Sequence, residues 1–157
     1  MNYSILNFDP REGRKMDVIE MYRLKRGVKL NLPLLLSRLP AGFPSPADDY
    51  IEERIDLNKK LIKHPEATYL IRVMGDSMEK ARIYDGDYLI VDRALEPEHN
   101  DIVLAIFDGE FTVKRLIKKI DRWFLVAENP KYPPFEVTPE TDFEIWGKVT
   151  YIFHPAV

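Results

Sequence analysis

Apolar residues in the second half of the chain occur in short runs that are rich in branched and aromatic side chains. Such runs, separated by turn residues, are typical of antiparallel β-strands. The Asp108-Gly109 pair stands between two of the runs and is a strong signal for a hairpin turn. The pattern predicts a mainly β, compact antiparallel domain with six strands, at residues 69–74, 88–92, 102–107, 111–117, 123–126 and 145–153.

Two helices are expected before these strands. Asp17 can cap a short helix that ends at Gly27, and Ser45-Pro46 can start a second helix that runs until His64-Pro65 stops it. Their apolar residues recur at helical spacing: Met16, Ile19 and Tyr22 in the first helix, and Ile51, Ile55 and Ile62 in the second. The expected architecture is therefore a β domain behind a short helical, partly extended N-terminal arm.

The segment between the two predicted helices is rich in proline. Four prolines fall within the fifteen residues 32–46. Proline lacks a backbone donor and pushes the residue before it toward extended geometry. The chain around Ala41 and Gly42 is therefore expected to be extended and accessible, which is the conformation that a protease active site binds. These two small residues would also let a nucleophile approach the backbone closely.

Composition excludes several kinds of site. The 157 residues include no cysteine, so disulfides, thiolate metal sites and a cysteine nucleophile are impossible. The length suits one domain with its own core. No apolar run approaches the ~20 residues that cross a bilayer, and residues 1–8 lack the features of a secretory signal. We therefore expect no membrane association and a cytoplasmic location.

Charge is distributed unevenly along the chain. Residues 1–41 hold eight Lys/Arg against four Asp/Glu, whereas residues 42–157 hold 15 against 22. An acidic body argues against a nucleic-acid surface on residues 42–157. The basic arm could contact an anionic partner, or it could be a solvated polar helix.

Ser77 and Lys114 are the candidate catalytic residues. Ser77 follows a predicted strand within Gly75-Asp-Ser-Met78, where a turn can present its hydroxyl together with backbone N–H groups. A serine hydroxyl needs a neighbouring base, and none of the three histidines lies in a catalytic or metal-binding pattern. Lys114 lies inside an apolar strand. Burial there could lower its pKa from roughly 10.4 far enough to make it a base near neutral pH.

Each of these features also has a plainer interpretation. A serine after Gly-Asp is most often a turn residue, and Lys114 could be an exposed strand lysine. Asp85-Gly-Asp87 offers two carboxylates, but a turn that feeds the next strand is the better interpretation. The sequence contains no glycine-rich phosphate loop and no metal-ligand spacing, so neither a metal nor a cofactor is expected.

Taken in order, these residues resemble the UmuD branch of the LexA-type self-cleaving serine proteases, over about residues 41–157. Ala41-Gly42 resembles the cleavage site of that branch. Gly75-Asp-Ser-Met78 resembles its nucleophile motif, and Asp108-Gly-Glu-Phe-Thr-Val-Lys-Arg115 resembles the hairpin that carries its general base. A cleavage site, a serine and a lysine in this order, with serine and lysine 37 positions apart, are far more specific than any one of them.

The resemblance implies a serine endopeptidase with a Ser-Lys dyad. Lys114 would take the proton from Ser77, whose oxygen would attack the carbonyl carbon of Ala41. Backbone N–H groups at Asp76 and Ser77 would stabilise the oxyanion, and Lys114 would return the proton to the leaving amine of Gly42. The cut could occur within one chain or between the two chains of a homodimer.

The resemblance also implies partners and a biological setting. Residues 1–41 would be an arm that self-cleavage removes, and residues 42–157 would be the protease domain and the processed form. A RecA filament on single-stranded DNA would activate the cut in the SOS response to DNA damage. The processed form would then join a UmuC-like subunit in an error-prone translesion DNA polymerase. No direct sequence-specific DNA binding is expected.

Three other functions remain possible on sequence grounds. A LexA-like or phage-type repressor would carry the same protease body behind a helix-turn-helix domain, for which 41 residues with one helix are too few. A signal peptidase also uses serine and lysine, but it needs a membrane anchor. A non-catalytic β-rich interaction module would leave Ser77 and Lys114 without a role.

Overall fold

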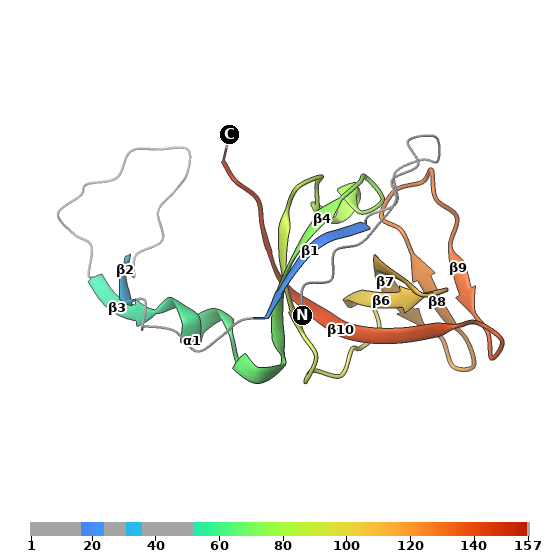
Figure 1. The fold of residues 1–157 in the computed structure, drawn as a ribbon, viewed down its shortest axis with the longest axis horizontal. Coiled ribbons are helices and arrows are strands. Elements are labelled where there is room, and N and C mark those ends of the chain that lie inside the picture. The colour runs from blue at the N-terminus through green and yellow to red at the C-terminus, as the bar shows by residue number, and fades with distance from the viewer. Residues whose placement is uncertain (1–16, 24–30, 36–51, 157) are drawn as a thin grey trace.

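The computed structural model describes residues 17–23, 31–35 and 52–156, and this part of the chain is mainly β (Figure 1). Eight strands form one antiparallel sheet in the order β1-β4-β5-β10-β6-β7-β8-β9, which confirms the predicted fold class. These strands are β1 Asp17–Arg23, β4 Thr68–Met74, β5 Tyr88–Asp92, β6 Ile102–Phe107, β7 Glu110–Lys118, β8 Trp123–Val126, β9 Phe135–Val137 and β10 Phe143–Phe153. A short strand, β9, joins the six that the sequence predicts and extends the edge beyond β8.

The six predicted strands are all present, with ends within two residues of the predicted ones. The predicted hairpin is present as well, because Phe107 pairs with Glu110 across a turn of Asp108 and Gly109. Both turn residues have positive φ, 48° and 79°, as the favoured two-residue hairpin turn requires. The hairpin register places Lys114 opposite the buried Val103.

The helix predicted from Asp17 is wrong, because residues 17–23 form β1 and pair with β4. Its predicted end lies outside the described residues. A β-bulge between Val18 and Glu20 adds one residue to β1, so that Val18 and Met21 both reach the core although they are three positions apart. The buried positions are thus not those on which the helix was predicted: Tyr22 is 51% exposed, and Met16 lies outside the described residues. Pairing with a neighbouring strand outweighs weak local helix propensity.

The second predicted helix is mostly wrong. Its expected start and Ile51 lie outside the described residues, and residues 52–56 form a strand, β3 Glu52–Asp56, which pairs with β2 Asn31–Leu35. Only α1 Leu57–Leu61 is helical, because the Asp56 carboxylate accepts a hydrogen bond from the backbone N–H of Asn58 and starts the helix there. Ile55 lies opposite Leu32 in the strand pair, and its branched side chain suits a strand.

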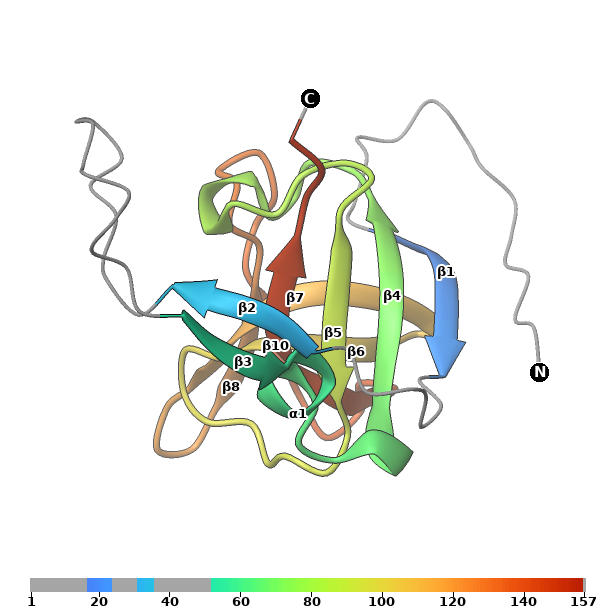
Figure 2. The ribbon, with the colours of Figure 1, turned by 90° about the vertical axis from the view of Figure 1, so that its left-hand side faces the viewer.

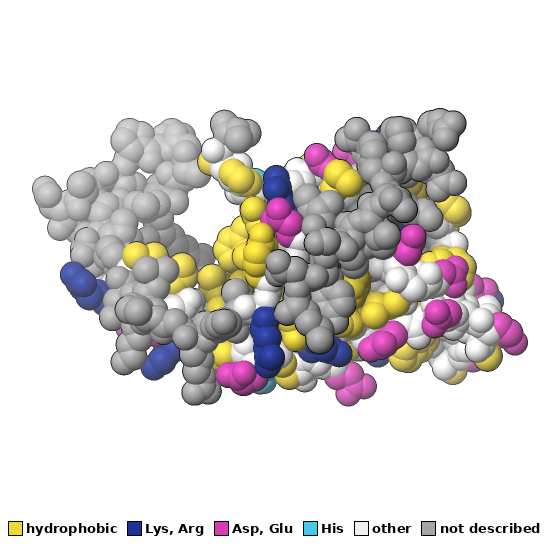
Figure 3. Space-filling view, viewed as in Figure 1, with side chains coloured by type: hydrophobic (Ala, Val, Ile, Leu, Met, Phe, Trp, Pro, Cys, Tyr) yellow, Lys and Arg dark blue, Asp and Glu magenta, His cyan; other side chains and the backbone are white. Residues whose placement is uncertain are grey.

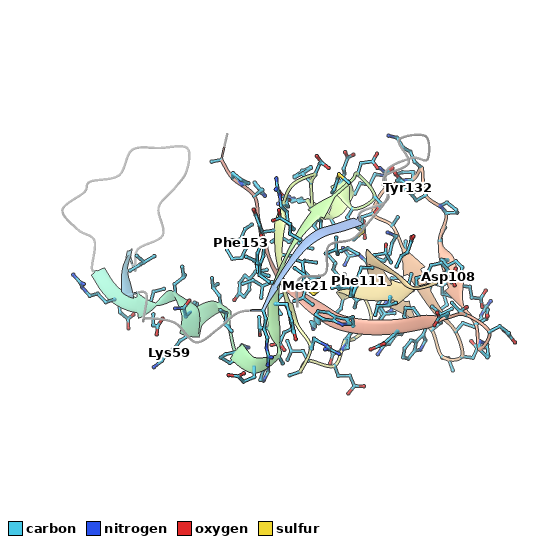
Figure 4. The ribbon with its side chains drawn as sticks, viewed as in Figure 1. Met21, Lys59, Asp108, Phe111, Tyr132 and Phe153 are labelled. Atoms are coloured by element: carbon cyan, nitrogen blue, oxygen red, sulfur yellow. The ribbon has the colours of Figure 1, made fainter. Side chains whose placement is uncertain are left out.

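The large sheet curves back on itself and encloses a core. Figure 2 shows β4, β5 and β10 standing across β6 and β7, which run behind them. The main cluster of fully buried side chains lies between these two parts of the sheet: Ile71, Val73, Met78, Ile83, Leu89, Val91, Leu104 and Val113. Met21 of β1 and Phe111 of β7, labelled in Figure 4, both pack against it. A second cluster lies among β6, β7 and β8: Val103, Ala105, Leu116 and Leu125.

The curvature passes through β10, the strand between β5 and β6. Its register shifts between Ile145 and Gly147 against β6, and between Val149 and Tyr151 against β5. Bulges of this kind bend a strand and increase its twist. Gly147 is buried beside β5, and a Cβ there would lie 2.6 Å from Cγ1 of Val91. The missing side chain therefore lets β10 approach β5 closely.

Gly147→Ala should lower the free energy of unfolding by about 1–3 kcal/mol, as overpacking in a close-packed interior does. The added methyl group would meet Val91 and lie 3.3 Å from the backbone oxygen of Asp92. Urea denaturation followed by tryptophan fluorescence measures the change. Glu144→Ala, at an exposed position of the same strand, is the matched control and should change stability by less than about 0.5 kcal/mol. Equal stability of the two variants would contradict the close approach.

Candidate active site

Ser77 lies in the turn that follows β4. Gly75 turns the chain with φ 112°, and its N–H donates to Oδ1 of Asp85 at 2.8 Å. Met78 is fully buried in the main core cluster and anchors the far side of the turn, before the short 3-10 helix η3 Glu79–Ala81. Ser77 itself has an exposed fraction of 0%. The turn is thus held on both sides of the serine, and the hydroxyl faces the interior of the protein.

Lys114 reaches Ser77 from β7 on the other part of the sheet. Its Nζ lies 3.2 Å from Oγ of Ser77, so the structure brings the two predicted residues together. Nζ also lies 2.8 Å from Oγ1 of Thr112 and 2.9 Å from the carbonyl oxygen of Val113. A neutral amine has two N–H donors and one lone pair. Nζ stands as donor to all three oxygens here; were the amine neutral, donation to Thr112 and Val113 would leave its lone pair for the Ser77 hydroxyl, as a base beside a nucleophile requires.

Thr112 was not identified from the sequence. It stands two residues before Lys114, and residues two apart on a strand share a face of the sheet. Strand alternation could therefore have pointed to it. The hydroxyl of Thr112 directs the lysine amine toward Ser77.

A second group that the sequence did not reveal is the loop of residues 128–132, which we call the clamp loop. Three of its residues bind Asp76, the residue before the serine. Nδ2 of Asn129 donates to the Asp76 carbonyl at 2.9 Å, the Tyr132 hydroxyl donates to the Asp76 carboxylate, and Nζ of Lys131 lies 3.3 Å from that carboxylate. The only local signal was a turn-like Asn129-Pro130 pair, because these partners are more than 50 positions from Asp76.

Asn129 controls the direction of a backbone donor at the serine. Asn129 is 7% exposed, and the Asp76 carbonyl that its side chain binds also accepts the N–H of Glu79 at 3.3 Å. The described residues contain no cis peptide, and in a trans peptide the N–H points away from the C=O of the same unit. Holding the Asp76 carbonyl therefore turns the N–H of Ser77 to the opposite side, away from Asn129. A backbone N–H fixed in this way is what an oxyanion site needs.

The clamp loop is tied to the strand that carries Lys114. The Arg115 Nε donates to the Glu128 carboxylate, and the backbone oxygen of Glu128 accepts the N–H of Lys80 at 2.9 Å. Arg115 and Glu128 are both about three-quarters buried, which strengthens a charged hydrogen bond. One loop thus links the serine turn to the lysine strand.

Asp76 stays ionised in this setting. The hydrogen bond from Tyr132 holds the pKa of the Asp76 carboxyl below its ordinary value near 3.8, and Lys131 acts in the same direction, although partial burial opposes both. Figure 4 shows Tyr132 on the same side of the β domain as the turn after β4. An ionised Asp76 keeps both donors of the clamp loop engaged at neutral pH.

The structure describes only some of the other positions that the sequence analysis considered. Ala41 and Gly42 lie outside the described residues. The three histidines are held elsewhere: Nδ1 of His64 lies 2.7 Å from the Asp92 carboxylate, His99 accepts the N–H of Lys118, and His154 packs against Tyr84. Within the described part of the chain no group of three or more His, Asp or Glu could hold a metal ion.

None of the described helices is both long and apolar enough to span a membrane.

In the view of Figure 3, acidic side chains are frequent around the end of the sheet where β6, β7 and β10 meet. The described surface on this face therefore has the acidic character expected from the sequence.

Comparison with known proteins gives consistent matches. Residues 33–150 match the family model described as Peptidase S24-like. Protein MucA of Salmonella typhimurium is 43% identical over 144 residues, which is 90% of this chain and 97% of MucA. Protein SamA of the same species is 48% identical over 127 residues, 81% of this chain and 88% of SamA. The LexA repressor of Ectopseudomonas mendocina is 41% identical over 106 residues, 68% of this chain but 52% of the repressor.

Tyr132→Phe removes the hydrogen bond that most lowers the pKa of Asp76, so that pKa should rise toward its ordinary value. A carboxyl with a lowered folded-state pKa contributes stability above its ordinary pKa and loses it as pH falls through the lowered one. The variant should therefore be less stable by about 1 kcal/mol at neutral pH, and by less in acid.

Carboxyl NMR titration and urea denaturation at neutral and acid pH measure these two effects. Asp101, which lies 2.7 Å from Nζ of Lys148, is the internal control and should titrate alike in both proteins. An unchanged Asp76 titration in the variant would contradict the proposed role of the tyrosine.

Proposed function

Because this chain belongs to the S24-like peptidase family, in its UmuD-like branch, we propose that it is a serine endopeptidase that cuts its own backbone once, between Ala41 and Gly42. Ser77 is the nucleophile and Lys114 is its base. The observation that supports this most strongly is the 3.2 Å separation of Nζ of Lys114 and Oγ of Ser77, residues that come from opposite parts of the curved sheet.

The first half of the reaction transfers the acyl group to the enzyme. Neutral Lys114 accepts the hydroxyl proton of Ser77 while Oγ bonds to the carbonyl carbon of Ala41, and the carbonyl electron pair moves onto oxygen. Backbone N–H groups of Ser77 and Asp76 stabilise this oxyanion. The C–N bond then breaks, and Lys114 gives its proton to the nitrogen of Gly42.

The second half returns the enzyme to its starting state. Lys114 takes a proton from water as the water oxygen attacks the acyl carbon on Ser77. The ester bond breaks, Ser77 regains its proton, and residue 41 keeps a free carboxylate. Water must reach the site for this step; Lys114 is partly exposed, whereas the serine is fully buried.

The cut would divide the chain into an arm, residues 1–41, and a processed form, residues 42–157. We place the reaction in the cytoplasmic SOS response, with a RecA filament on single-stranded DNA as the activator. The processed form would serve as a homodimeric accessory subunit of an error-prone polymerase with a UmuC-like partner. Similarity to MucA and SamA along most of their length supports this assignment.

A self-cleaving repressor is a weaker alternative. It would need a helix-turn-helix domain in the arm, but the described arm residues, 17–23 and 31–35, are strands. The chain also matches only 52% of the LexA repressor. The acidic body gives no electrostatic support for direct DNA binding.

Incubation of the purified protein with and without an activated RecA filament tests the proposal. Edman sequencing and intact mass should find one new N-terminus at Gly42. Ser77→Ala and Lys114→Ala should each abolish it, and Lys119→Ala, an exposed lysine one residue beyond β7, is the matched control that should retain it. Cleavage at another bond, or undiminished cleavage in the Ser77→Ala protein, would defeat the mechanism.

Asn129→Asp tests the oxyanion geometry. The aspartate keeps the acceptor that binds the N–H of Lys131 but replaces the donor to the Asp76 carbonyl by a repelling oxygen. The Ser77 N–H should then lose its fixed direction, and self-cleavage should slow by about 10- to 100-fold, less than for loss of a direct oxyanion donor. The rate is followed by gel densitometry. Asn58→Asp, at an exposed position on α1, is the control, and equal rates for the two variants would exclude a role for Asn129.

A further inference from the structure

The β1 strand forms one edge of the large sheet and covers β4. It pairs with β4 along its whole length, from Asp17 opposite Met74 to Arg23 opposite Tyr69. β4 is therefore an interior strand only because β1 is present. Without β1, one side of β4 would present a row of unpaired N–H and C=O groups, which is a template for another strand.

Side chains of β1 add a specific pattern to this backbone pairing. Val18 and Met21 pack against the main core cluster, next to the fully buried Ile71 and Val73 of β4. Because of the bulge, both reach the core from one strand. The edge of β4 thus carries two apolar positions that the occupying strand must fill.

A charged pair gives the edge a third recognition element. The Glu20 carboxylate lies 3.8 Å from Nη1 of Arg72 on β4. The Nε of Arg72 is buried, and no hydrogen-bond partner for it is found among the described residues. Tyr88 of β5 lies below the guanidinium, whose carbon is 5.7 Å from the ring centroid. Arg72 therefore presents a cation at this edge that favours an acidic side chain on the strand that occupies it.

Cleavage would change how firmly β1 holds this place. This part of the inference rests on the proposed function, because a cut between Ala41 and Gly42 separates β1 from residues 42–157, which contain β4. Before the cut, the connecting chain keeps β1 at an effective concentration on the order of millimolar beside β4. After the cut, only non-covalent contacts hold the fragment of residues 1–41: β1 on β4, with its two apolar anchors, and β2 on β3.

We propose that the β4 edge is a strand-binding site, which residues 17–23 occupy in the intact chain and an extended segment of a partner protein occupies after cleavage. The partner segment places apolar side chains where Val18 and Met21 lie and a carboxylate opposite Arg72. Addition of a strand to a sheet edge is a recurrent mode of protein recognition, in which backbone bonds give affinity and side-chain positions give specificity. Removal of the arm then exchanges an internal strand for an external one.

A peptide-binding experiment on the full-length chain tests the edge without any cleavage. All proteins carry Ser77→Ala. Val18→Asp with Met21→Asp should displace β1, so that β4 amides lose protection from hydrogen exchange and a fluorescent peptide of residues 17–23 binds, measured by anisotropy. Glu20→Arg is a second displacing variant that leaves the apolar contacts in place. Arg23→Gln, at the exposed last position of β1, leaves Val18, Glu20 and Met21 unchanged; it is the matched control and should exclude the peptide.

The peptide experiment has one result that supports the strand-binding site and two that overturn it. Saturable binding to the displaced variants alone, about tenfold weaker for a peptide with lysine at the glutamate position, supports the site. Unchanged protection of β4 in both displaced variants, or no peptide binding to either, overturns it. These results do not depend on whether the protein cuts itself.

A last measurement tests whether a partner strand can replace β1 after cleavage. After self-cleavage of the unmodified protein at micromolar concentration, the fragment of residues 1–41 should separate from the body on gel filtration. Because β2 of the fragment also pairs with β3 of the body, hydrogen exchange of the β4 amides in the cleaved protein identifies the contact that remains. Elution of the fragment with the body together with unchanged protection of β4 would show that the edge stays occupied by its own strand and would overturn exchange with a partner. Absence of cleavage would instead contradict the proposed function, and the peptide experiment would still decide whether β4 binds a strand.

Discussion

The contact between the Lys114 amine and the Ser77 hydroxyl is the interaction on which the functional interpretation depends. Neither side chain has special chemistry alone, because a free serine is a weak nucleophile and a lysine in water is charged. Their 3.2 Å approach requires that β7 lie across the turn after β4. The curved sheet achieves this by bending at β10, where Gly147 lets two strands come unusually close.

Around this contact, the structure holds the serine turn from several directions. Met78 anchors it in the core, Asp85 binds the N–H of Gly75, and Asn129 of the clamp loop binds the Asp76 carbonyl. Arg115 and Glu128 connect the clamp loop to the lysine strand. A catalytic pair gains most from such fixed surroundings, because no reorganisation is then needed as charge develops on the substrate oxygen.

Prediction from sequence succeeded where information was local. Apolar runs located six strands, and Asp108-Gly109 located the hairpin that presents Lys114. It failed where a distant strand decided the structure, as with β1, which pairs with β4, and with β3, which pairs with β2. The meeting of Ser77 and Lys114 was expected from family resemblance. The clamp loop was missed because Asn129 and Tyr132 bind Asp76 across 53 and 56 positions, a separation that leaves no local pattern.

Labelling with a fluorophosphonate, which reacts with activated serine hydroxyls, tests the Ser77–Lys114 pair most directly and needs no self-cleavage. Peptide mapping of the labelled protein should find one adduct, on Ser77. The labelling rate should fall by about 100-fold in the Lys114→Ala protein, because the base that activates the hydroxyl is gone. Equal labelling rates with and without Lys114, or an adduct on a different serine, would contradict the pairing on which the proposed function rests.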